Sequence, residues 1–211
     1  MSESHAPVAR GPIAVVGPAQ ILDGWEVGSV RASAELTLTD ATPLAKLSVR
    51  APGDGAARGA LGTPFGRAHR HPSLGLVIGS GPGEWLILGP PGSGARVSTE
   101  LTRIARESAE FVTVVDLTHG RALVRLRGAE SAHLLAKLCA VDLTDSVIPN
   151  GAAFRSSVAR ITTDVVRDDT GGERSYLLHC ERSSGQYLAE CLLDAGAEFG
   201  IAVDAFTSPG I

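Results

Sequence analysis

The chain has 211 residues, of which 44% are hydrophobic, 25 are glycine and 12 are proline. This apolar fraction excludes a disordered chain, and a protein of this length buries about 70% of the surface that its unfolded chain exposes. The 23 acidic and 19 basic residues are mixed along the sequence and give a net charge of −4. They provide no basic face, so nucleic acid is not expected as a partner.

The cysteines and the amino terminus indicate a protein of the cytoplasm. Cys139, Cys180 and Cys191 are an odd number without a C-x-x-C spacing, so neither a disulfide framework nor a cysteine metal motif is predicted. The first residues lack the basic segment and apolar run of a signal peptide. No stretch approaches the ~18 uninterrupted apolar residues of a membrane-spanning helix, so we expect a soluble, cytoplasmic protein with no membrane partner.

Residues 1–42 mix proline, glycine and small residues without a sustained hydrophobic period. We interpret them as an amino-terminal extension that docks onto a partner, because they lack the pattern of a domain with its own core. The remaining sequence divides into a first half at 43–118, a second half at 119–206 and a tail at 207–211, which together form one compact unit.

The first half is predicted to contain a strand, a hairpin and a helix. Residues 46–50 alternate between apolar and polar side chains, as in a half-buried strand. Residues 76–78 and 85–88 form a hairpin around a glycine-rich tip. A weak helix is expected near 54–61. A longer helix follows the hairpin, with its apolar positions at helical spacing: Val97, Leu101, Ile104 and Ala105.

The second half repeats this order. Residues 124–127 alternate as a strand, residues 130–139 form a helix, and 158–166 and 176–178 form a hairpin around a glycine pair. A second helix follows, and its apolar positions are Leu188, Cys191, Leu192 and Ala195.

A short internal match supports duplication. Residues 109–116 and 197–204 are identical at five of eight positions, and both follow a predicted helix. Shared composition at helix-to-strand junctions is the alternative explanation. We predict an α+β fold of two tandem βαββαβ repeats, each a split-βαβ unit of the ferredoxin-like kind, whose open sheet faces cover one another.

A glycine-rich loop at 89–96 resembles a phosphate-binding loop in its place between a strand and a helix. Such a loop requires a lysine after its last glycine and then a hydroxyl residue, whereas Ala95 and Arg96 stand here. We therefore predict a strand-to-helix turn without a nucleotide.

Two further segments carry groups capable of chemistry. His69 and His71 are spaced to share one face of an extended chain and to hold a metal, but no third ligand lies nearby, so a solvated basic loop is favoured. Residues 116–121 place an acid, a hydroxyl, an imidazole and a guanidinium together, and Glu84 lies before Trp85. The segment 116–121 suits either a small acidic ligand or the capping of the junction between the halves, and we favour the junction.

Nucleophilic catalysis is not indicated. The segments 79–81 and 92–94 are Gly-Ser-Gly and do not supply a G-x-S-x-G elbow, and the cysteines are interpreted as core and strand-end residues. We assign no catalytic, cofactor-binding or metal-binding residue to this chain.

Several segments carry a resemblance to a known family. They are an Asp-Leu-Thr-His-Gly-Arg strand leading to Gly128, a helix at 130–139 followed by Asp142-Leu143, an Ile-Pro-Asn-Gly turn at 148–151 and a strand leading to Asp164. Together with the strand at 83–89, they resemble the gamma subunit of heterotetrameric sarcosine oxidase. More distantly, the chain is similar to the folate-binding domain of the glycine-cleavage aminomethyltransferases. The resemblance covers residues 43–206.

This resemblance implies the non-catalytic assembly subunit of an oxidoreductase complex. Such a complex demethylates sarcosine oxidatively and passes the one-carbon unit to tetrahydrofolate. In that family the alpha subunit holds dinucleotide and folate, the beta subunit holds the flavins and the delta subunit binds zinc, so flavin, NAD, tetrahydrofolate and zinc are expected in the partners and no cofactor in this chain. Two alternatives are a free-standing folate-binding one-carbon transferase or repair factor, and a scaffold domain of an unrelated assembly. The aminomethyltransferases have a further barrel domain without a counterpart here, so no folate-contacting residue is carried over.

Overall fold

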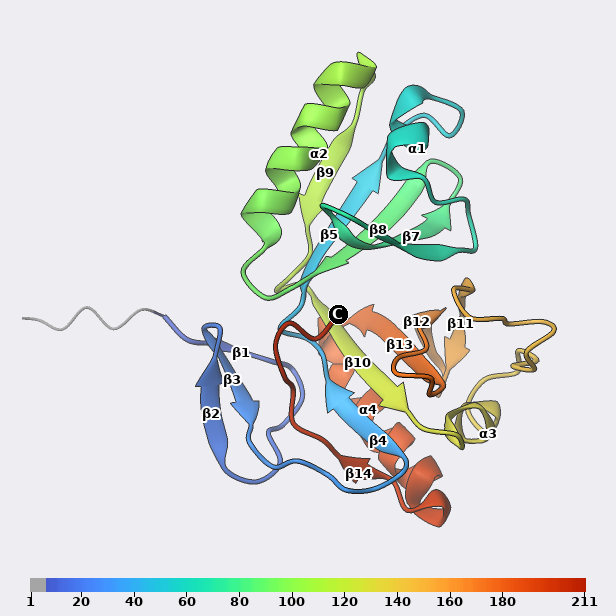
Figure 1. Ribbon diagram of the computed structural model, residues 1–211. Helices are drawn as coiled ribbons and strands as arrows, with labels where there is room; N and C mark the ends of the chain where they lie inside the picture. The colour runs from blue at the N-terminus through green and yellow to red at the C-terminus, as the bar shows by residue number, and fades with distance from the viewer. Residues whose placement is uncertain (1–6) are drawn as a thin grey trace, which may run out of the picture.

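The computed structural model describes residues 7–211 apart from the side chain of Ser108. An antiparallel sheet and a mixed sheet pack face to face, and the α-helices of each half cover the outer side of its sheet (Figure 1). The fold is therefore α+β, with four layers in the order helix, sheet, sheet, helix. Among the described residues, no helix is long and apolar enough to cross a membrane.

The first half forms a five-stranded sheet with the strand order β6-β7-β8-β5-β9. Its strands are β5 (Ala45–Arg50), β6 (Ala68–His71), β7 (Gly75–Gly81), β8 (Glu84–Gly89) and β9 (Thr113–Asp116). Its helices are α1 (Ala56–Leu61) and α2 (Gly94–Ser108). The predicted apolar positions Val97, Leu101 and Ile104 of α2 are buried against the sheet, as helical spacing requires.

The second half forms a six-stranded sheet with the order β11-β12-β13-β10-β4-β14. Its strands are β10 (Arg121–Arg127), β11 (Ala153–Val158), β12 (Ile161–Arg167), β13 (Ser175–Glu181) and β14 (Ala202–Val203), joined by β4 (Thr37–Asp40) from the amino-terminal segment. The helical elements are α3 (Ser131–Ala136), α4 (Gly185–Gly196) and the short 3₁₀ turns η1 (Arg182–Ser184) and η2 (Ala197–Phe199).

The amino-terminal segment forms a small sheet of its own and then adds one strand to the sheet of the second half. Three short strands, β1 (Ala9–Arg10), β2 (Ala19–Leu22) and β3 (Trp25–Gly28), form a small sheet at the side of the molecule (Figure 1). Trp25 and Val27 turn inward and are buried. The strand β4 then pairs with β10 on one side and β14 on the other. Part of the segment that was expected to dock onto a partner thus docks onto the chain's own second sheet, and residues 1–6 lie outside the described residues.

Each half contains one strand more than the predicted βαββαβ order. Along the chain the first half runs β5-α1-β6-β7-β8-α2-β9 and the second half runs β10-α3-β11-β12-β13-α4-β14. The additional strands are β6 and β11, which are edge strands of the two sheets. The expectation of a solvated loop at 69–71 was wrong, because this polar segment pairs with β7. An edge strand with polar side chains does not show the alternation by which a half-buried strand is predicted.

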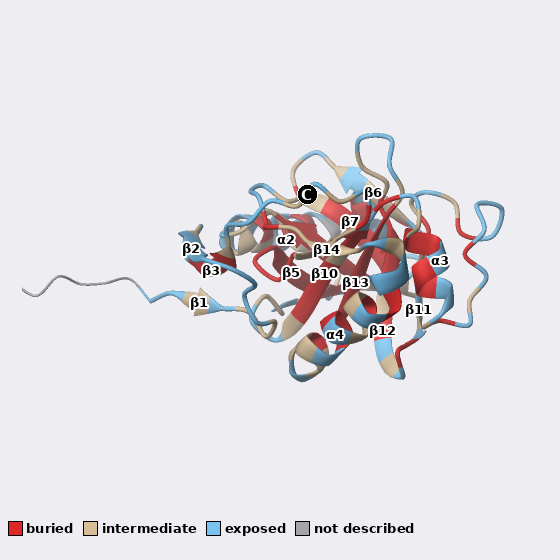
Figure 2. Cartoon of the chain, turned by 90° about the horizontal axis from the view of Figure 1, so that it is seen from below, coloured by how far each residue is buried: buried red, intermediate tan, exposed pale blue. Residues whose placement is uncertain are grey.

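The layer between the two sheets is apolar at its centre. Leu76, Leu88 and Ile78 of the first sheet pack against Leu123 and Leu177 of the second. Figure 2 shows these central strands as buried, with exposed residues in the loops and on the outer surfaces of the helices. Because strand side chains alternate, the same faces also bring polar side chains into this layer, and these build the candidate sites.

Candidate functional site

A cleft of about 340 Å³ opens at one edge of the layer between the sheets. It is lined by residues from the amino-terminal segment, β4, β6, β10 and the last eight residues of the sequence. Its lining includes four arginines, Arg31, Arg70, Arg125 and Arg127, and the hydroxyls of Thr37 and Thr39. Among the described residues that line the cleft, Asp204 is the one acidic side chain.

Asp168 joins two of these arginines across the two halves. Arg70 of β6 donates from Nη2 to both carboxylate oxygens of Asp168, at 2.9 and 3.1 Å. Arg125 of β10 donates from Nη2 to the same carboxylate at 2.8 Å and from Nη1 to Ser175 Oγ at 2.8 Å. Asp168 and Arg125 have only 9% and 11% of their side chains exposed, so both are held firmly. One carboxylate thus faces two guanidinium groups, which leaves a net positive charge.

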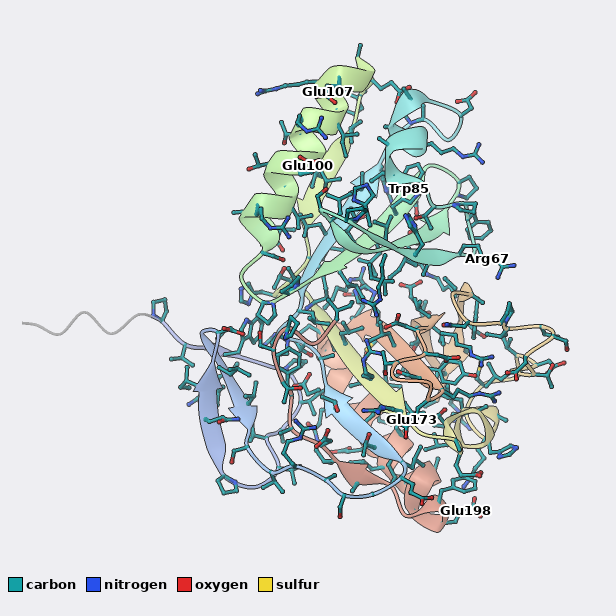
Figure 3. The ribbon with its side chains drawn as sticks, viewed as in Figure 1. Arg67, Trp85, Glu100, Glu107, Glu173 and Glu198 are labelled. Atoms are coloured by element: carbon teal, nitrogen blue, oxygen red, sulfur yellow. The ribbon has the colours of Figure 1, made fainter. Side chains whose placement is uncertain are left out.

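The other two arginines have carboxylate partners at the rim. Arg31 makes a two-point contact with Asp204, at 2.9 and 3.2 Å, which holds the loop after β3 against the carboxyl-terminal segment. Arg127 pairs through Nε with Glu173 at 2.6 Å. Glu173, labelled in Figure 3, is 54% exposed, so this pair is solvated.

A buried lysine lies elsewhere in the same layer. Lys46 is 0% exposed, and its Nζ donates to the carbonyl oxygens of Thr42 at 2.7 Å and Leu44 at 2.8 Å. Burial lowers the pKa of Lys46 to about 7, although the carboxylates of Asp40 and Asp116 act in the opposite direction. Burial likewise raises the pKa of Asp40. This amine lies where the chain crosses from β4 of one sheet to β5 of the other.

His179 and Asp164 form a third polar group. His179 Nδ1 lies 3.2 Å from Asp164 Oδ2, and Arg155 Nε donates to Asp164 Oδ1 at 2.6 Å. Burial lowers the pKa of His179. Burial alone would raise the pKa of Asp164, but the bonds from His179 and Arg155 outweigh it and lower that pKa. The Nε2 atom of His179 is buried without a partner among the described residues.

The glycine-rich loop at 89–96 is a strand-to-helix turn, as the sequence predicted. It joins β8 to α2, and Ser93 closes it by donating its hydroxyl to the carbonyl of Pro90 at 2.7 Å. Arg96 donates to the carbonyl of Ser73. Both polar side chains are therefore engaged with the protein's own backbone.

The two histidines of β6 have separate partners. His69 bonds to Thr63 Oγ1, and His71 Nδ1 accepts from the backbone N–H of Ser73 at 3.3 Å. Their rings lie edge to face with centroids 6.3 Å apart. Within residues 7–211 no group of three or more potential metal ligands occurs.

The segment at 116–121 forms the turn between β9 and β10, and its side chains do not converge. Asp116 accepts from the backbone N–H of Thr118 at 2.8 Å. The ring of His119 stacks on Trp25 at 4.8 Å, and Arg121 pairs with Glu181. These contacts favour the interpretation as a capped junction. Glu84 also has a local partner, Arg50, at 3.1 Å.

The three cysteines are free thiols. Cys139 and Cys180 are buried, and Cys191 is partly buried on α4. Burial raises the pKa of Cys180 to about 11, which disfavours the reactive thiolate. The interpretation of these cysteines as core and strand-end residues fits this environment.

The residues of the cleft and the buried lysine were missed by the sequence analysis. Arg70 and Asp168 are 98 positions apart, so no local motif joins them. The one available signal was the alternation of Arg121, Arg125 and Arg127 along β10, which places arginines on one face of a strand.

A protein family and two solved structures are similar to this chain. The GCVT N-terminal domain family matches residues 78–207. A chain of the heterotetrameric sarcosine oxidase from Corynebacterium sp. U-96, solved in complex with pyrrole 2-carboxylate, is similar with a TM-score of 0.68 and 24% identity over 82% of this chain and 89% of that one. Among proteins of curated function, none matches this sequence closely.

The glycine cleavage system aminomethyltransferase T from Bartonella henselae is also similar, with a TM-score of 0.68 and 15% identity. The alignment covers 89% of this chain and 55% of that protein, so this chain spans about half the length of the transferase. At these identities the two structures show a shared fold. The family match spans more than half of the sequence, and the chain belongs to the GCVT N-terminal domain family.

Proposed function

We propose that this chain is a non-catalytic, gamma-like assembly subunit of a heterotetrameric sarcosine oxidase complex in the cytoplasm. The observation that carries the proposal is the extent of the structural match. The alignment with the sarcosine oxidase chain spans 82% of this protein and 89% of its counterpart, so most of each chain has an equivalent in the other. The transferase, by contrast, extends well beyond the matched region.

The exposed apolar side chains support a role in assembly. Ten large hydrophobic residues are exposed among the described residues, and five of them lie between residues 8 and 30. They are Val8, Val15, Val16, Ile21 and Val30. Apolar side chains gathered on one side of a molecule are typical of a protein interface. We therefore assign this segment to contact with the alpha, beta or delta subunit.

The proposed complex supplies the chemistry from its other subunits. Flavin, NAD, tetrahydrofolate and zinc belong to the partners, and this chain contributes contact surface. The complex would oxidise sarcosine or a related N-methyl amine and transfer the one-carbon unit to tetrahydrofolate. We further propose that the two halves arose as tandem copies, on the strength of their common element order.

The experiment is co-purification. An affinity-tagged chain is expressed with the neighbouring genes of its operon, and the absorbance spectrum of the purified material is recorded. We expect flavin-bearing subunits to co-purify, whereas the same chain expressed alone is colourless and inactive. A tagged chain that elutes without a flavoprotein from such cells contradicts the proposal.

A free-standing folate-binding one-carbon transferase or repair factor is the second candidate. The family match and the cleft of about 340 Å³ favour it, because that volume falls within the range of small-molecule sites. Calorimetry with tetrahydrofolate separates the two functions. Micromolar binding by the chain alone supports the transferase, and the absence of heat supports the assembly subunit.

A further inference from the structure

We propose that the cleft lined by Arg31, Arg70, Arg125 and Arg127 binds the oxyanion of a small organic acid. This inference does not depend on the proposed assembly role, since it concerns a ligand of the isolated chain. It rests on the charge of the cleft, on the rigidity of one guanidinium group and on the composition of the walls.

The arginines of the cleft outnumber the carboxylates with which they pair. The ion pair of Arg31 with Asp204 and that of Arg127 with Glu173 are each neutral. Arg70 and Arg125 share the single carboxylate of Asp168, so this trio carries one uncompensated positive charge. Ile211 also lines the cleft, and among the described residues its carboxylate forms no ion pair with these arginines. A monoanionic ligand between Arg70 and Arg125 would pair with the positive charge of the trio, and arginine is the side chain best suited to a planar or tetrahedral oxyanion.

Preorganisation is the second argument. Asp168 and Ser175 hold Arg125 by hydrogen bonds of 2.8 Å while its side chain remains 11% exposed. Its guanidinium is thus fixed before a ligand arrives, which reduces the entropy that binding costs. Arg70 and Arg127 meet their carboxylates through Nη2 and Nε respectively. Each guanidinium has five N–H donors, so both retain donors for a ligand.

The walls define the rest of the ligand. The hydroxyls of Thr37 and Thr39 lie on the β4 side, and Ala41, Phe206 and Pro209 supply apolar surface. A cavity of about 340 Å³ is at the lower end of small-molecule sites. A compact molecule with one carboxylate or phosphate group and an apolar body matches these features.

Calorimetry with benzoate, inorganic phosphate and neutral benzamide tests the proposal on the full chain. We expect benzoate or phosphate to bind and benzamide not to bind, because benzamide keeps the ring of benzoate but lacks its charge. Tighter binding of benzoate identifies a carboxylate ligand, and tighter binding of phosphate identifies a phosphorylated one. Failure of both anions to bind overturns the proposal.

Three variants place the binding in the cleft. Arg127→Gln and Arg70→Gln each remove one guanidinium, and we expect each to weaken anion binding about tenfold, the effect of one charge-assisted hydrogen bond. Arg50→Gln is the matched control, since Arg50 is also a strand arginine in one ion pair but lies outside the cleft. Equal weakening by all three variants, or by none, contradicts the assignment. If Arg70→Gln does not fold, Arg127→Gln decides, because its glutamate partner is solvated.

Discussion

The two halves of the molecule have the same order of helices and strands, but they complete their sheets differently. In the first half β9 pairs directly with β5. In the second half β4 lies between β10 and β14, so a strand from the amino-terminal segment completes the sheet. Residues 37–40 therefore belong to the folding unit of the second half, whereas the sheet of the first half is built from its own strands.

Gly128→Ala tests the contact between the second half and the amino-terminal segment. Gly128 follows β10 with φ of +135°, and a Cβ atom there would lie 2.2 Å from the carbonyl oxygen of Glu35, just before β4. Both the backbone strain and the clash oppose a side chain, so we expect the free energy of unfolding to fall by about 3 kcal/mol. Urea denaturation measures the effect.

Gly172→Ala is the matched control for that change. Gly172 also has a positive φ, +81°, but no atom lies within 4 Å of its Cβ position. The substitution should therefore lower the free energy of unfolding by only about 1 kcal/mol. If both variants lose the same free energy of unfolding, the close contact between Gly128 and the amino-terminal segment does not account for the loss in Gly128→Ala.

Lys46→Met tests the crossing between the two sheets through its pH dependence. The folded pKa of Lys46 is about 7, below the ~10.4 of an unfolded lysine. Between these values the unfolded chain binds the additional proton, so stability rises with pH from 7 upward and the penalty for the buried charge is greatest below pH 7. We expect the free energy of unfolding of the wild-type protein to rise by about 2 kcal/mol between pH 7 and 9 because of Lys46.

The methionine variant keeps the length and apolar stem of the side chain but has no titrating amine. Its free energy of unfolding should therefore not show this rise between pH 7 and 9. Lys137→Met is the control, because Lys137 is 43% exposed and pairs with Glu198 at the surface. Urea denaturation at both pH values gives the comparison. An unchanged pH dependence in Lys46→Met would contradict the account of the buried amine.

Glu110→Ala tests a smaller difference between the halves. In the first half, Glu110 accepts from the backbone N–H groups of Ala56 at 2.6 Å and Ala57 at 3.0 Å, and so caps α1. In the corresponding helix α3, the N-cap residue Glu130 makes no side-chain cap bond, and no described side chain takes the place that Glu110 has at α1. Loss of the cap should destabilise the first half by about 1 kcal/mol.

Thermal unfolding measures this change. Glu107→Ala, which removes an exposed partner of Arg103 on α2, is its control and should have a smaller effect. A stability loss in Glu107→Ala as large as that in Glu110→Ala would remove the distinction between a capped and an uncapped helix.

The sequence predicts those elements whose side chains alternate or repeat over many residues. The helical spacing of Val97, Leu101 and Ile104 and the glycine-rich tip of the β7–β8 hairpin are local signals, and both predictions were confirmed. The strands β6 and β4 were not predicted, because β6 is polar and β4 pairs with residues more than 80 positions away. Their pairing is decided by tertiary contacts that propensity does not record.

The candidate site was less predictable than the fold for the same reason. Arg70, Arg125 and Asp168 come from different strands and loops, and each reads as an ordinary surface charge in the sequence. Lys46 sits in an alternating strand, where its polar side chain was expected to face solvent. The second sheet covers that face and buries the amine.

We propose that this chain completes a flavoenzyme complex whose chemistry the other subunits supply. The most direct measurement is the sarcosine oxidase activity and flavin content of the complex recovered from cells in which this gene alone is deleted. We expect that the complex from these cells lacks its full activity and flavin content, and that a plasmid copy of the gene restores both. Recovery of a fully active flavoenzyme without this chain would contradict the claim.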